Sequence, residues 1–281
     1  MNNIIDGKLV SSHLRKEIAE EIVELKNQGI NPGLAVILVG NNPASAVYVR
    51  NKERACLETG IKPAQISLSE KTTEEELITL IKKLNNDESI HGILVQLPLP
   101  DHISEKKVIE TIAVSKDVDA FSHDSVGRIM TREYSFLPCT PAGIMELLKF
   151  YNIDINGKEC VVVGRSNIVG KPMAMLLLNS NGTVTVCHSR TKNLKDVCKR
   201  ADIIVCAVGK ANFLKADMVK KGAVVIDVGI NRTEEGKIVG DVDFPAVSEV
   251  ASMITPVPGG VGPMTITMLL KNTLTAAKRL K

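Results

Sequence analysis

Tryptophan is absent from this 281-residue chain, and aromatic residues make up only 3% of it. Proteins that bind single-stranded nucleic acid stack bases on aromatic side chains, so this composition argues against such a role. The charges nearly cancel, because 35 Lys and Arg residues stand against 32 Asp and Glu residues and leave a net charge of +3. We therefore expect neither the strongly basic face of a nucleic-acid-binding protein nor one suited to a membrane surface.

Long apolar runs are also missing. No segment approaches 18 consecutive apolar residues, so no membrane-spanning helix is expected. Residues 1–7 have neither the basic nor the apolar region of a signal peptide, and they lack the Arg- and Ser-rich character of a transit peptide. These observations predict a cytoplasmic protein.

The six cysteines and five histidines follow no metal-binding pattern. No two cysteines form a C-x-x-C pair, and no H-E-x-x-H motif occurs. We predict no metal site, and we expect the thiols to be reduced and mostly buried. Cys139 and Cys187 lie near segments discussed below, but a nucleophilic cysteine needs a neighbouring base that the sequence does not show, so we expect them to pack.

Short apolar runs alternate with helical segments along the whole chain. The runs at 34–39 and 92–97 are typical of strands buried on both faces, and helices are expected at about 43–58 and 74–84. Ser11-Ser12 can cap the first helix. A second series of strands is expected at 160–163, 183–187, 203–207 and 223–228. This alternation predicts an α/β fold with mostly parallel sheets.

The length indicates two domains, at roughly 150 residues per domain. We place a catalytic domain at 1–137 and a Rossmann-like nucleotide-binding domain at 138–263, with the active-site cleft between them. The last helix, 264–281, is expected to pack back on the first domain. Residues 117–138 look polar and irregular.

A glycine-containing turn in the second domain indicates a nucleotide site. Gly164 follows the strand at 160–163 and precedes a helix. Glycine in this place lets the backbone approach a pyrophosphate, which the free N–H groups at the helix N-terminus stabilise. Residues 164–172 do not match G-x-G-x-x-G, so a tight turn without a ligand stays open as an alternative.

The end of the next strand favours NADP over NAD. An NAD site usually carries Asp or Glu there for the ribose 2′-hydroxyl. Residues 186–191 instead read VCHSRT, without a carboxylate. We expect Ser189, together with Arg165 or Arg190, to hold a 2′-phosphate. The alternative is that Arg190 is an ordinary surface charge.

A reactive pair is expected in the first domain. Tyr48 and Lys52 are four residues apart on a predicted helix and so share one face. Gln96 ends another strand, at the edge where open α/β sheets bind ligands. For Lys52 to act as a base near neutral pH, its pKa must fall from about 10.4 toward 7, which burial can achieve. A solvated lysine beside a packed tyrosine is the alternative.

The Y-x-x-x-K pattern also occurs in short-chain dehydrogenases. There the pair comes after the glycine-rich loop of the same domain. Here it precedes Gly164 by more than a hundred residues and belongs to another predicted domain, which argues against that interpretation.

Eight segments form an ordered set along the chain. They are GNNPASAVYVRNK at 40–52, VQLPLP at 95–100, KDVDAF at 116–121, PCTPAG at 138–143, VVVGRSNIVGKPMA at 161–174, TVCHSRT at 185–191, VIDVGIN at 225–231 and ITPVPGGVGPMT at 254–265. Together they resemble the bifunctional methylenetetrahydrofolate dehydrogenase/methenyltetrahydrofolate cyclohydrolase family, essentially from end to end. The resemblance implies oxidation of 5,10-methylenetetrahydrofolate with NADP and hydrolysis of the methenyl product to 10-formyltetrahydrofolate, in one-carbon metabolism. It also implies a homodimer formed through the nucleotide domain.

The resemblance assigns roles to individual residues. It implies that Lys52 is the acid–base residue of the cyclohydrolase step, that Tyr48 orients the folate ring and that Gln96 holds Lys52. Asp119 is expected to accept the N–H donors of the pterin. The implied folate-binding residues are Tyr48, Lys52, Gln96, Leu97, Asp119, Pro258, Gly259 and Gly260. The implied NADP-binding residues are Gly164, Arg165, Ser166, Ser189, Arg190 and Ile230.

Three positions depart from the family pattern. Ala120 stands where the family usually has Gly, and an alanine there would strain the loop if the position needs positive φ. Ser125 replaces a common Asn, and Asn42 stands where Asp is frequent.

Two other functions remain open from the sequence. One is a dehydrogenase that lacks cyclohydrolase activity, and the other is a non-catalytic NADP-binding protein. The presence of Tyr48, Lys52, Gln96 and Asp119 together argues against the second.

Overall fold

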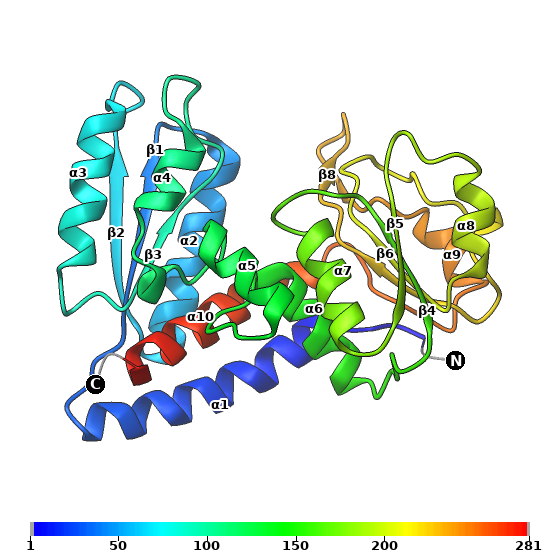
Figure 1. The fold of residues 1–281 in the computed structure, drawn as a ribbon, viewed down its shortest axis with the longest axis horizontal. Helices are drawn as coiled ribbons and strands as arrows, with labels where there is room; N and C mark the ends of the chain where they lie inside the picture. Colours follow the sequence, from blue (N-terminus) through cyan, green and yellow to red (C-terminus); the bar gives the residue numbers. More distant parts are fainter. Residues whose placement is uncertain (1–2, 280–281) are drawn as a thin grey trace. The chain divides into compact units, whose positions relative to one another are not determined.

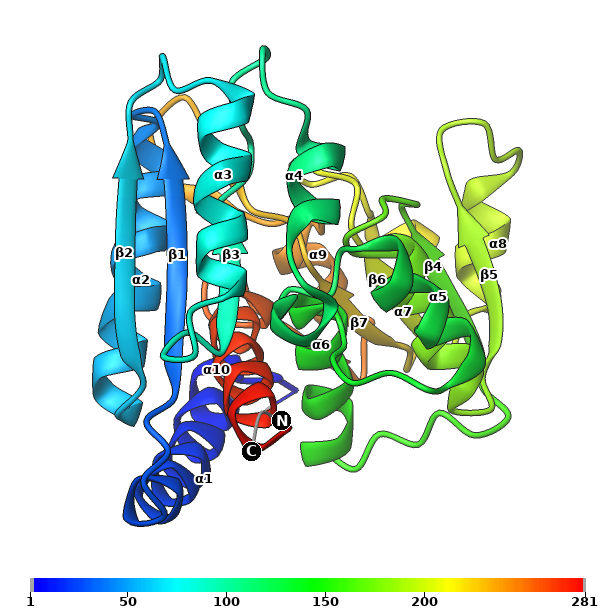
Figure 2. The same ribbon diagram turned by 60° about the vertical axis from the view of Figure 1, so that its left-hand side comes forward.

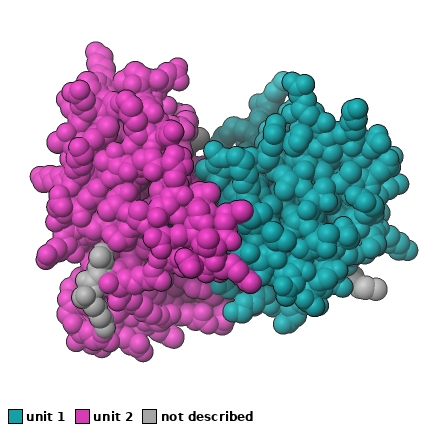
Figure 3. Space-filling view, in the orientation of Figure 1, with its two compact units in different colours: residues 1–12, 139–265 teal, residues 13–138, 266–281 magenta. Residues whose placement is uncertain are grey.

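The computed structural model describes residues 3–279; the two residues at each end, including the last two of the predicted helix 264–281, lie outside the described part. The chain divides into two compact units (Figure 3). Unit 1 consists of residues 1–12 and 139–265, and unit 2 of residues 13–138 and 266–281. The domain boundaries expected from the sequence, 1–137 and 138–263, differ from this division chiefly in residues 1–12, which fold with the nucleotide-domain segment.

Unit 2 is built on a three-stranded parallel sheet with the strand order β2-β1-β3. The strands are β1 (Gly33–Val39), β2 (Lys62–Leu68) and β3 (Gly92–Val95). Every residue of β1 is buried, as expected for a central strand with helices on both faces. The helices are α2 (Pro43–Thr59) on one face and α3 (Glu74–Asn85) and α4 (Glu105–Thr111) on the other (Figure 2).

The first helix, α1 (Gly7–Asn27), begins one turn earlier than the predicted cap at Ser11-Ser12. Oδ1 of Asp6 accepts hydrogen bonds from the backbone N–H groups of Lys8, at 2.9 Å, and Leu9, at 3.1 Å. Asp6 therefore satisfies the free N–H groups that a capping residue must satisfy, and the serines lie inside the helix.

The last helix, α10 (Val261–Arg279), lies alongside α1 in both ribbon views (Figures 1 and 2). Within unit 2, Arg15 Nε donates to Thr267 Oγ1 at 3.1 Å. Nδ2 of Asn272 donates to the carbonyl of Val118 at 2.8 Å. Unit 2 therefore contains the C-terminal segment as well as the catalytic-domain segment.

The prediction that residues 117–138 are irregular was wrong for α5 (His123–Thr131). Ser122 Oγ accepts from the backbone N–H of Ser125 at 3.2 Å and so caps this helix. Arg132, with φ of +65°, ends it. The helix is short and mostly exposed, so its apolar periodicity was too weak to outweigh its polar composition.

Unit 1 holds a five-stranded parallel sheet with the order β10-β7-β6-β4-β5. Its strands are β4 (Glu159–Val163), β5 (Thr183–Cys187), β6 (Ile203–Cys206), β7 (Val224–Asp227) and β10 (Met253–Ile254). Helices α6 (Cys139–Phe150) and α7 (Gly170–Asn179) cover one face, and α8 (Leu194–Arg200) and α9 (Phe244–Ser248) the other. Unit 1 also contains an antiparallel pair, β8 (Asn231–Arg232) with β9 (Ile238–Val239), and the 3-10 turn Ala216–Met218, whereas the 3-10 turn Val114–Lys116 belongs to unit 2. The prediction of two α/β domains with mostly parallel sheets is confirmed.

None of the six cysteines forms a disulfide, and all six are buried, as predicted. Burial raises the pKa of the Cys56 and Cys198 thiols to about 12, so these thiols stay protonated and act as small apolar side chains. Between residues 3 and 279, no three His, Cys, Asp or Glu side chains gather as a metal ion would require. None of the helices in that range has the length and apolar character needed to cross a bilayer.

Candidate active site

The structure brings Lys52 and Gln96 together. Nζ of Lys52 donates to Oε1 of Gln96 at 2.9 Å, and Nε2 of Gln96 donates to the carbonyl of Leu97 at 2.8 Å. Lys52 is only 8% exposed, so the alternative of a solvated lysine was wrong. Lys52 lies on α2, which follows β1, and Gln96 directly follows the last residue of β3. The pair therefore lies where the carboxyl ends of two neighbouring strands meet, the usual ligand position in such sheets.

The helix that carries Lys52 starts with a side-chain cap. Oδ1 of Asn42 accepts from the backbone N–H of Ser45 at 3.1 Å. Asn and Asp serve equally well as caps, so the departure from Asp at this position does not disturb α2. Tyr48 lies one turn before Lys52 and is 40% exposed. Partial burial raises the pKa of its phenol above the usual value of 10, so Tyr48 keeps its proton at neutral pH.

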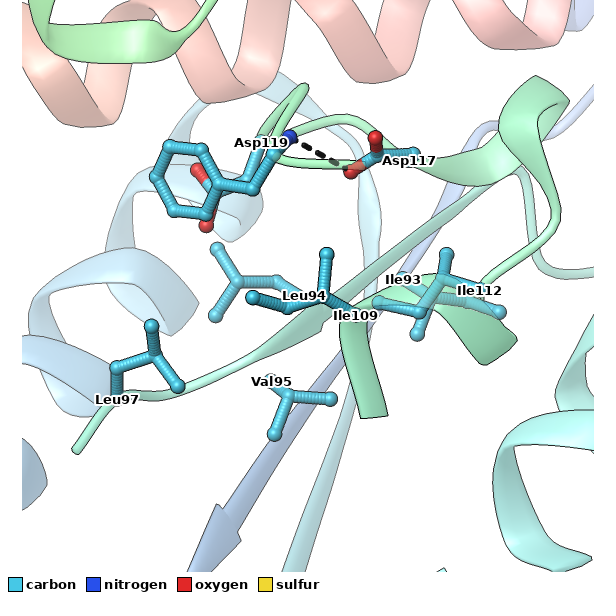
Figure 4. A pocket seen from close by; sticks show the side chains of 9 residues that line it. Ile93, Leu94, Val95, Leu97, Ile109, Ile112, Asp117 and Asp119 are labelled. Carbon is cyan, nitrogen blue, oxygen red and sulfur yellow. Dashed lines mark hydrogen bonds between the residues drawn. The ribbon is translucent and has the colours of Figure 1, made fainter. Parts of the chain in front are cut away.

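The loop that carries Asp119 is held by a buried carboxylate, Asp117. Asp117 is 1% exposed, and its Oδ2 accepts from the backbone N–H of Ser122 at 3.0 Å and from Oγ of Ser125 at 2.7 Å. Its Oδ1 accepts from the backbone N–H of Phe121 at 3.3 Å (Figure 4). These bonds fold the chain tightly around Asp119.

Asp119 lines a small hollow in unit 2 (Figure 4). The other lining residues are mostly apolar: Ile93, Leu94, Val95, Leu97, Ile109, Ile112, Asp117 and Phe121. The hollow includes two of the predicted folate-binding residues, Leu97 and Asp119, but its lining does not include Tyr48, Lys52 or Gln96. The predicted residues of unit 2 thus form two groups, joined through the Gln96–Leu97 peptide.

In unit 1, Gly164 packs against neighbouring backbone. Its φ is +123°, and a Cβ atom at this position would lie 2.2 Å from the carbonyl oxygen of Ala207. A Cβ on Gly170, the first residue of α7, would lie 2.3 Å from the carbonyl oxygen of Gly164. Only glycine allows strand, turn and helix to approach this closely, as in dinucleotide-binding turns.

Ser166 shapes the start of α7. Its Oγ accepts from the backbone N–H groups of Val169, at 3.2 Å, and Gly170, at 3.3 Å. Arg165 and Ser166 are exposed. Both are therefore accessible to an anion at the N-terminus of this helix.

The loop after β5 lies beside this turn. The backbone N–H of Gly164 donates to the carbonyl of Cys187 at 2.9 Å, which places the ends of β4 and β5 next to each other. Nδ1 of His188 accepts from the backbone N–H of Arg190 at 3.1 Å. Ser189 and Arg190 are exposed. No carboxylate occurs in 164–169 or 188–193, so both loops suit a phosphate.

The remaining predicted residues also belong to unit 1. Ile230 follows β7 and is 50% exposed. In the loop 258–260, the carbonyl of Gly259 accepts from the backbone N–H of Lys8 at 3.1 Å. This predicted folate-binding loop thus folds with the nucleotide-binding sheet, and its contribution to folate binding stays a prediction.

The strand order fixes where a dinucleotide fits. The chain passes from β4 to β5 on one side and then crosses to β6 on the other side of β4. In such sheets, ligands bind in the crevice between the loops that follow the two strands at this reversal. Those loops are 164–169 and 207–210, and the glycine turn and the exposed Arg165 and Ser166 belong to the first of them. The residues present therefore fit a dinucleotide phosphate.

Comparisons with known proteins identify the family of both parts of the chain. Residues 5–119 match the tetrahydrofolate dehydrogenase/cyclohydrolase catalytic domain, and residues 138–281 match the NAD(P)-binding domain of the same proteins. The chain belongs to the tetrahydrofolate dehydrogenase/cyclohydrolase family. The bifunctional protein FolD of Acetivibrio thermocellus is 64% identical over 275 residues, which cover 98% of this chain and 96% of that protein.

Solved structures of the family have the same fold. The bifunctional FolD enzyme of Campylobacter jejuni matches with a TM-score of 0.97 at 56% identity and covers 98% of each chain. The Trypanosoma brucei enzyme, solved as a complex with NADP cofactor and inhibitor, matches with a TM-score of 0.94 at 41% identity and covers 98% of this chain and 97% of that one.

Two departures from the family pattern have structural consequences. Ala120 has a φ of +57°, so the position where the family usually has Gly does need positive φ. Ser125, in place of a common Asn, donates to Asp117 and belongs to the network that holds the Asp119 loop. The loop therefore keeps its anchor while Ala120 carries strain.

This strain predicts an unusual result for a glycine substitution. A left-handed backbone conformation destabilises an alanine by roughly 1–2 kcal/mol, and replacing Ala120 with glycine relieves this strain. The same replacement removes a buried methyl group and makes the unfolded chain more flexible, and these two effects together destabilise the folded protein by a similar amount. Ala120→Gly should therefore leave the free energy of unfolding within about 1 kcal/mol. Ala55 lies in the middle of α2 and is 1% exposed, against 0% for Ala120. Ala55→Gly should lower the free energy by about 2 kcal/mol in denaturant titrations. Equal losses at the two positions would show that Ala120 carries no strain.

Sequence reasoning missed Asp117 as the anchor of this loop. Asp117 precedes Asp119 by two residues within KDVDAF, so its closeness was visible. Its partners Ser122 and Ser125 were not, because the segment that contains them was expected to be irregular.

Proposed function

We propose that this protein oxidises 5,10-methylenetetrahydrofolate with NADP and then hydrolyses the 5,10-methenyl product to 10-formyltetrahydrofolate. The observation that carries the proposal is the buried Lys52–Gln96 pair, 2.9 Å apart at the carboxyl edge of the sheet of unit 2, in a chain that matches the family over both domains. When bound, NADP supplies the acceptor for the hydride that leaves the methylene carbon.

Lys52 is the acid–base residue of the hydrolytic step. Water adds to the methenyl carbon and loses a proton, and the ring then opens as one C–N bond breaks and that nitrogen takes up a proton. A neutral Lys52 amine can accept the proton from water while one of its N–H bonds still points to Gln96 Oε1. Lys52 is 8% exposed, so little bulk water reaches the amine. Gln96 holds the amine in place, and Tyr48, with its phenol protonated, orients the folate ring.

Asp119 and Leu97 contribute to pterin binding in this proposal. A carboxylate pairs well with the adjacent N–H donors of a pterin, and the apolar side chains around Asp119 strengthen that pairing by excluding water. We also propose that the loop Pro258-Gly259-Gly260, which belongs to unit 1, contributes to folate binding, because its two glycines allow close backbone approach.

A coupled assay tests the proposal. Purified protein is mixed with 5,10-methylenetetrahydrofolate and NADP, and the reduced cofactor and the methenyl species are followed by absorbance. We expect reduced cofactor to accumulate and added methenyltetrahydrofolate to decay faster than in buffer. If reduced cofactor accumulates but the protein does not accelerate the decay of methenyltetrahydrofolate, the protein is a dehydrogenase without cyclohydrolase activity. Binding of NADP without either reaction would leave a non-catalytic binding protein.

NADP is held at Gly164, Arg165 and Ser166, with Ser189 and Arg190 beside the 2′-phosphate. Ser189→Asp would place a negative charge next to that phosphate, and like charges this close cost several kcal/mol. We expect the preference for NADP over NAD, as a ratio of kcat/KM values, to fall by about a hundredfold or more.

Ser189→Ala is the matched control, because it removes the hydroxyl without adding charge. It should change the NADP/NAD ratio much less than Ser189→Asp. An unchanged ratio in Ser189→Asp would contradict the assignment of this loop. Double substitution of Ser189 and Arg165 by Asp extends the same test.

We also infer a homodimer formed through the nucleotide-binding unit. β5 is an edge strand, so one side of its backbone is unpaired within the sheet. Val186 on this strand is 38% exposed, and Leu178 on the neighbouring α7 is 51% exposed. Apolar side chains at a bare strand edge support an interface here. Light scattering should give twice the 30.4 kDa mass of one chain, and a mass of one chain would refute the inference.

A further inference from the structure

Asp241 is a fully buried carboxylate that binds a whole loop. It is 0% exposed, and its Oδ2 accepts from the backbone N–H groups of Val208, at 2.6 Å, and Gly209, at 2.9 Å. Its Oδ1 accepts from the backbone N–H of Lys210 and from Nδ2 of Asn231, both at 2.9 Å. Four hydrogen-bond donors thus converge on this one carboxylate.

The loop that Asp241 holds follows β6 at the reversal of strand order. It starts beside the glycine turn, since a Cβ on Gly164 would touch the carbonyl of Ala207. The loop 208–210 therefore forms the wall of the dinucleotide crevice opposite Arg165 and Ser166. Without Asp241, three successive N–H groups of this wall would lose their acceptor and the loop would lose its fixed shape.

A second carboxylate, Asp227, fixes Asp241 in turn. Oδ1 of Asp227 accepts from the backbone N–H of Asp241 at 2.8 Å, and its Oδ2 accepts from that of Val242 at 3.0 Å. A Cβ on Gly229 would lie 2.1 Å from Oδ1 of Asp241, so the site has no spare room. Burial raises the pKa of Asp227 to about 6. Burying two carboxylates side by side is unfavourable unless hydrogen-bond donors surround them, and here the donors are backbone N–H groups and the side chain of Asn231.

We propose that Asp241 is a positioning residue for dinucleotide binding, which holds the 208–210 loop in the shape that accepts the cofactor. Through Asn231, the same carboxylate connects this loop to the segment that carries Ile230. The inference rests on the dehydrogenase half of the proposed function and adds a residue that does not touch the cofactor itself.

The test uses the full chain with Asp241→Asn, Asn231→Ala and the control Asp243→Asn. Asp243 lies two residues further on and binds Lys215 at the surface, so its substitution makes the same chemical change outside the buried network. The dissociation constant for NADPH is measured by fluorescence titration. KM and kcat are measured for the dehydrogenase, and the cyclohydrolase rate is measured without dinucleotide.

We expect Asp241→Asn to raise the dissociation constant for NADPH and KM for NADP by about tenfold, because at least one backbone N–H would meet an amide N–H instead of an oxygen. The rate at saturating NADP and the cyclohydrolase rate should change little. Asn231→Ala removes one of the four donors and should raise the dissociation constant about threefold; it carries the test if Asp241→Asn does not fold. Asp243→Asn should match the parent.

Two results would overturn the inference. One is unchanged NADPH affinity in folded Asp241→Asn or, where that variant does not fold, in Asn231→Ala. The other is a parallel loss of cyclohydrolase activity, which would show that the carboxylate only stabilises the protein. Failure of the parent protein to bind NADPH would instead refute the proposed function itself.

Discussion

Replacing Lys52 with methionine should lower the enzymatic hydrolysis of 5,10-methenyltetrahydrofolate by about 10²- to 10⁴-fold, the usual contribution of a positioned acid–base group. Methionine has nearly the length of lysine and suits a position that is 8% exposed, so the fold should persist. The change removes the only protein group that exchanges a proton in the proposed step and leaves Gln96 Oε1 without this donor. The decay of methenyl absorbance, corrected for the spontaneous rate, measures the effect.

Lys62→Met provides the control for this substitution. Lys62 begins β2 and is exposed, so the same chemical change there should leave both activities intact. The dehydrogenase reaction of Lys52→Met should fall less than hydrolysis, because hydride transfer does not require a proton to move. Parent-like hydrolysis by Lys52→Met would exclude Lys52 as the acid–base residue.

The fold was predictable because its strands are buried on both faces. The run LAVILV at 34–39 leaves no alternation for an exposed face, and the structure places β1 at the centre of its sheet. The start of α1 was missed because Asp6 and Ser11 are both good caps, and only the backbone geometry decides between them. α5 was missed because its stability comes from a cap and from two buried residues rather than from a long apolar stripe.

That Lys52 lies close to Gln96 was predictable for a different reason. Tyr48 and Lys52 share a helix face by spacing alone, and the carboxyl ends of parallel strands lie at one edge, so Gln96 had to be near them. The 2.9 Å bond between Lys52 and Gln96 agrees with that argument. The networks of Asp117 and Asp241 were not predictable in this way. Asp241 binds backbone N–H groups 31 to 33 residues away, and a backbone donor leaves no trace in the sequence.

Substituting Gly164 with alanine should reduce the dehydrogenase reaction by about a hundredfold or more while hydrolysis continues. The new Cβ would lie 2.2 Å from the carbonyl oxygen of Ala207, and the φ of +123° is unfavourable for any residue with a side chain. Neither partner can move easily, because the backbone N–H of Ala207 donates to Val163 at 2.8 Å and that of Gly164 donates to Cys187 at 2.9 Å. The clash can therefore be relieved only if the whole turn around residue 164 is displaced from its present position. A displacement of about 1 Å in an element that positions a substrate can lower the rate a hundredfold.

Gly222→Ala separates close packing from backbone strain. Gly222 also lies in unit 1 and has a φ of +84°, but nothing lies within 4 Å of a Cβ built there. Its substitution carries the conformational cost alone, so it should lower stability slightly and leave NADPH affinity unchanged. Gly164→Ala should weaken NADPH binding in a titration and keep its cyclohydrolase rate, because Lys52 and Gln96 belong to unit 2. If Gly164→Ala bound NADPH as tightly as the parent, the close approach of this turn to β6 would not be needed for the cofactor, and the nucleotide site would have to lie elsewhere on the sheet.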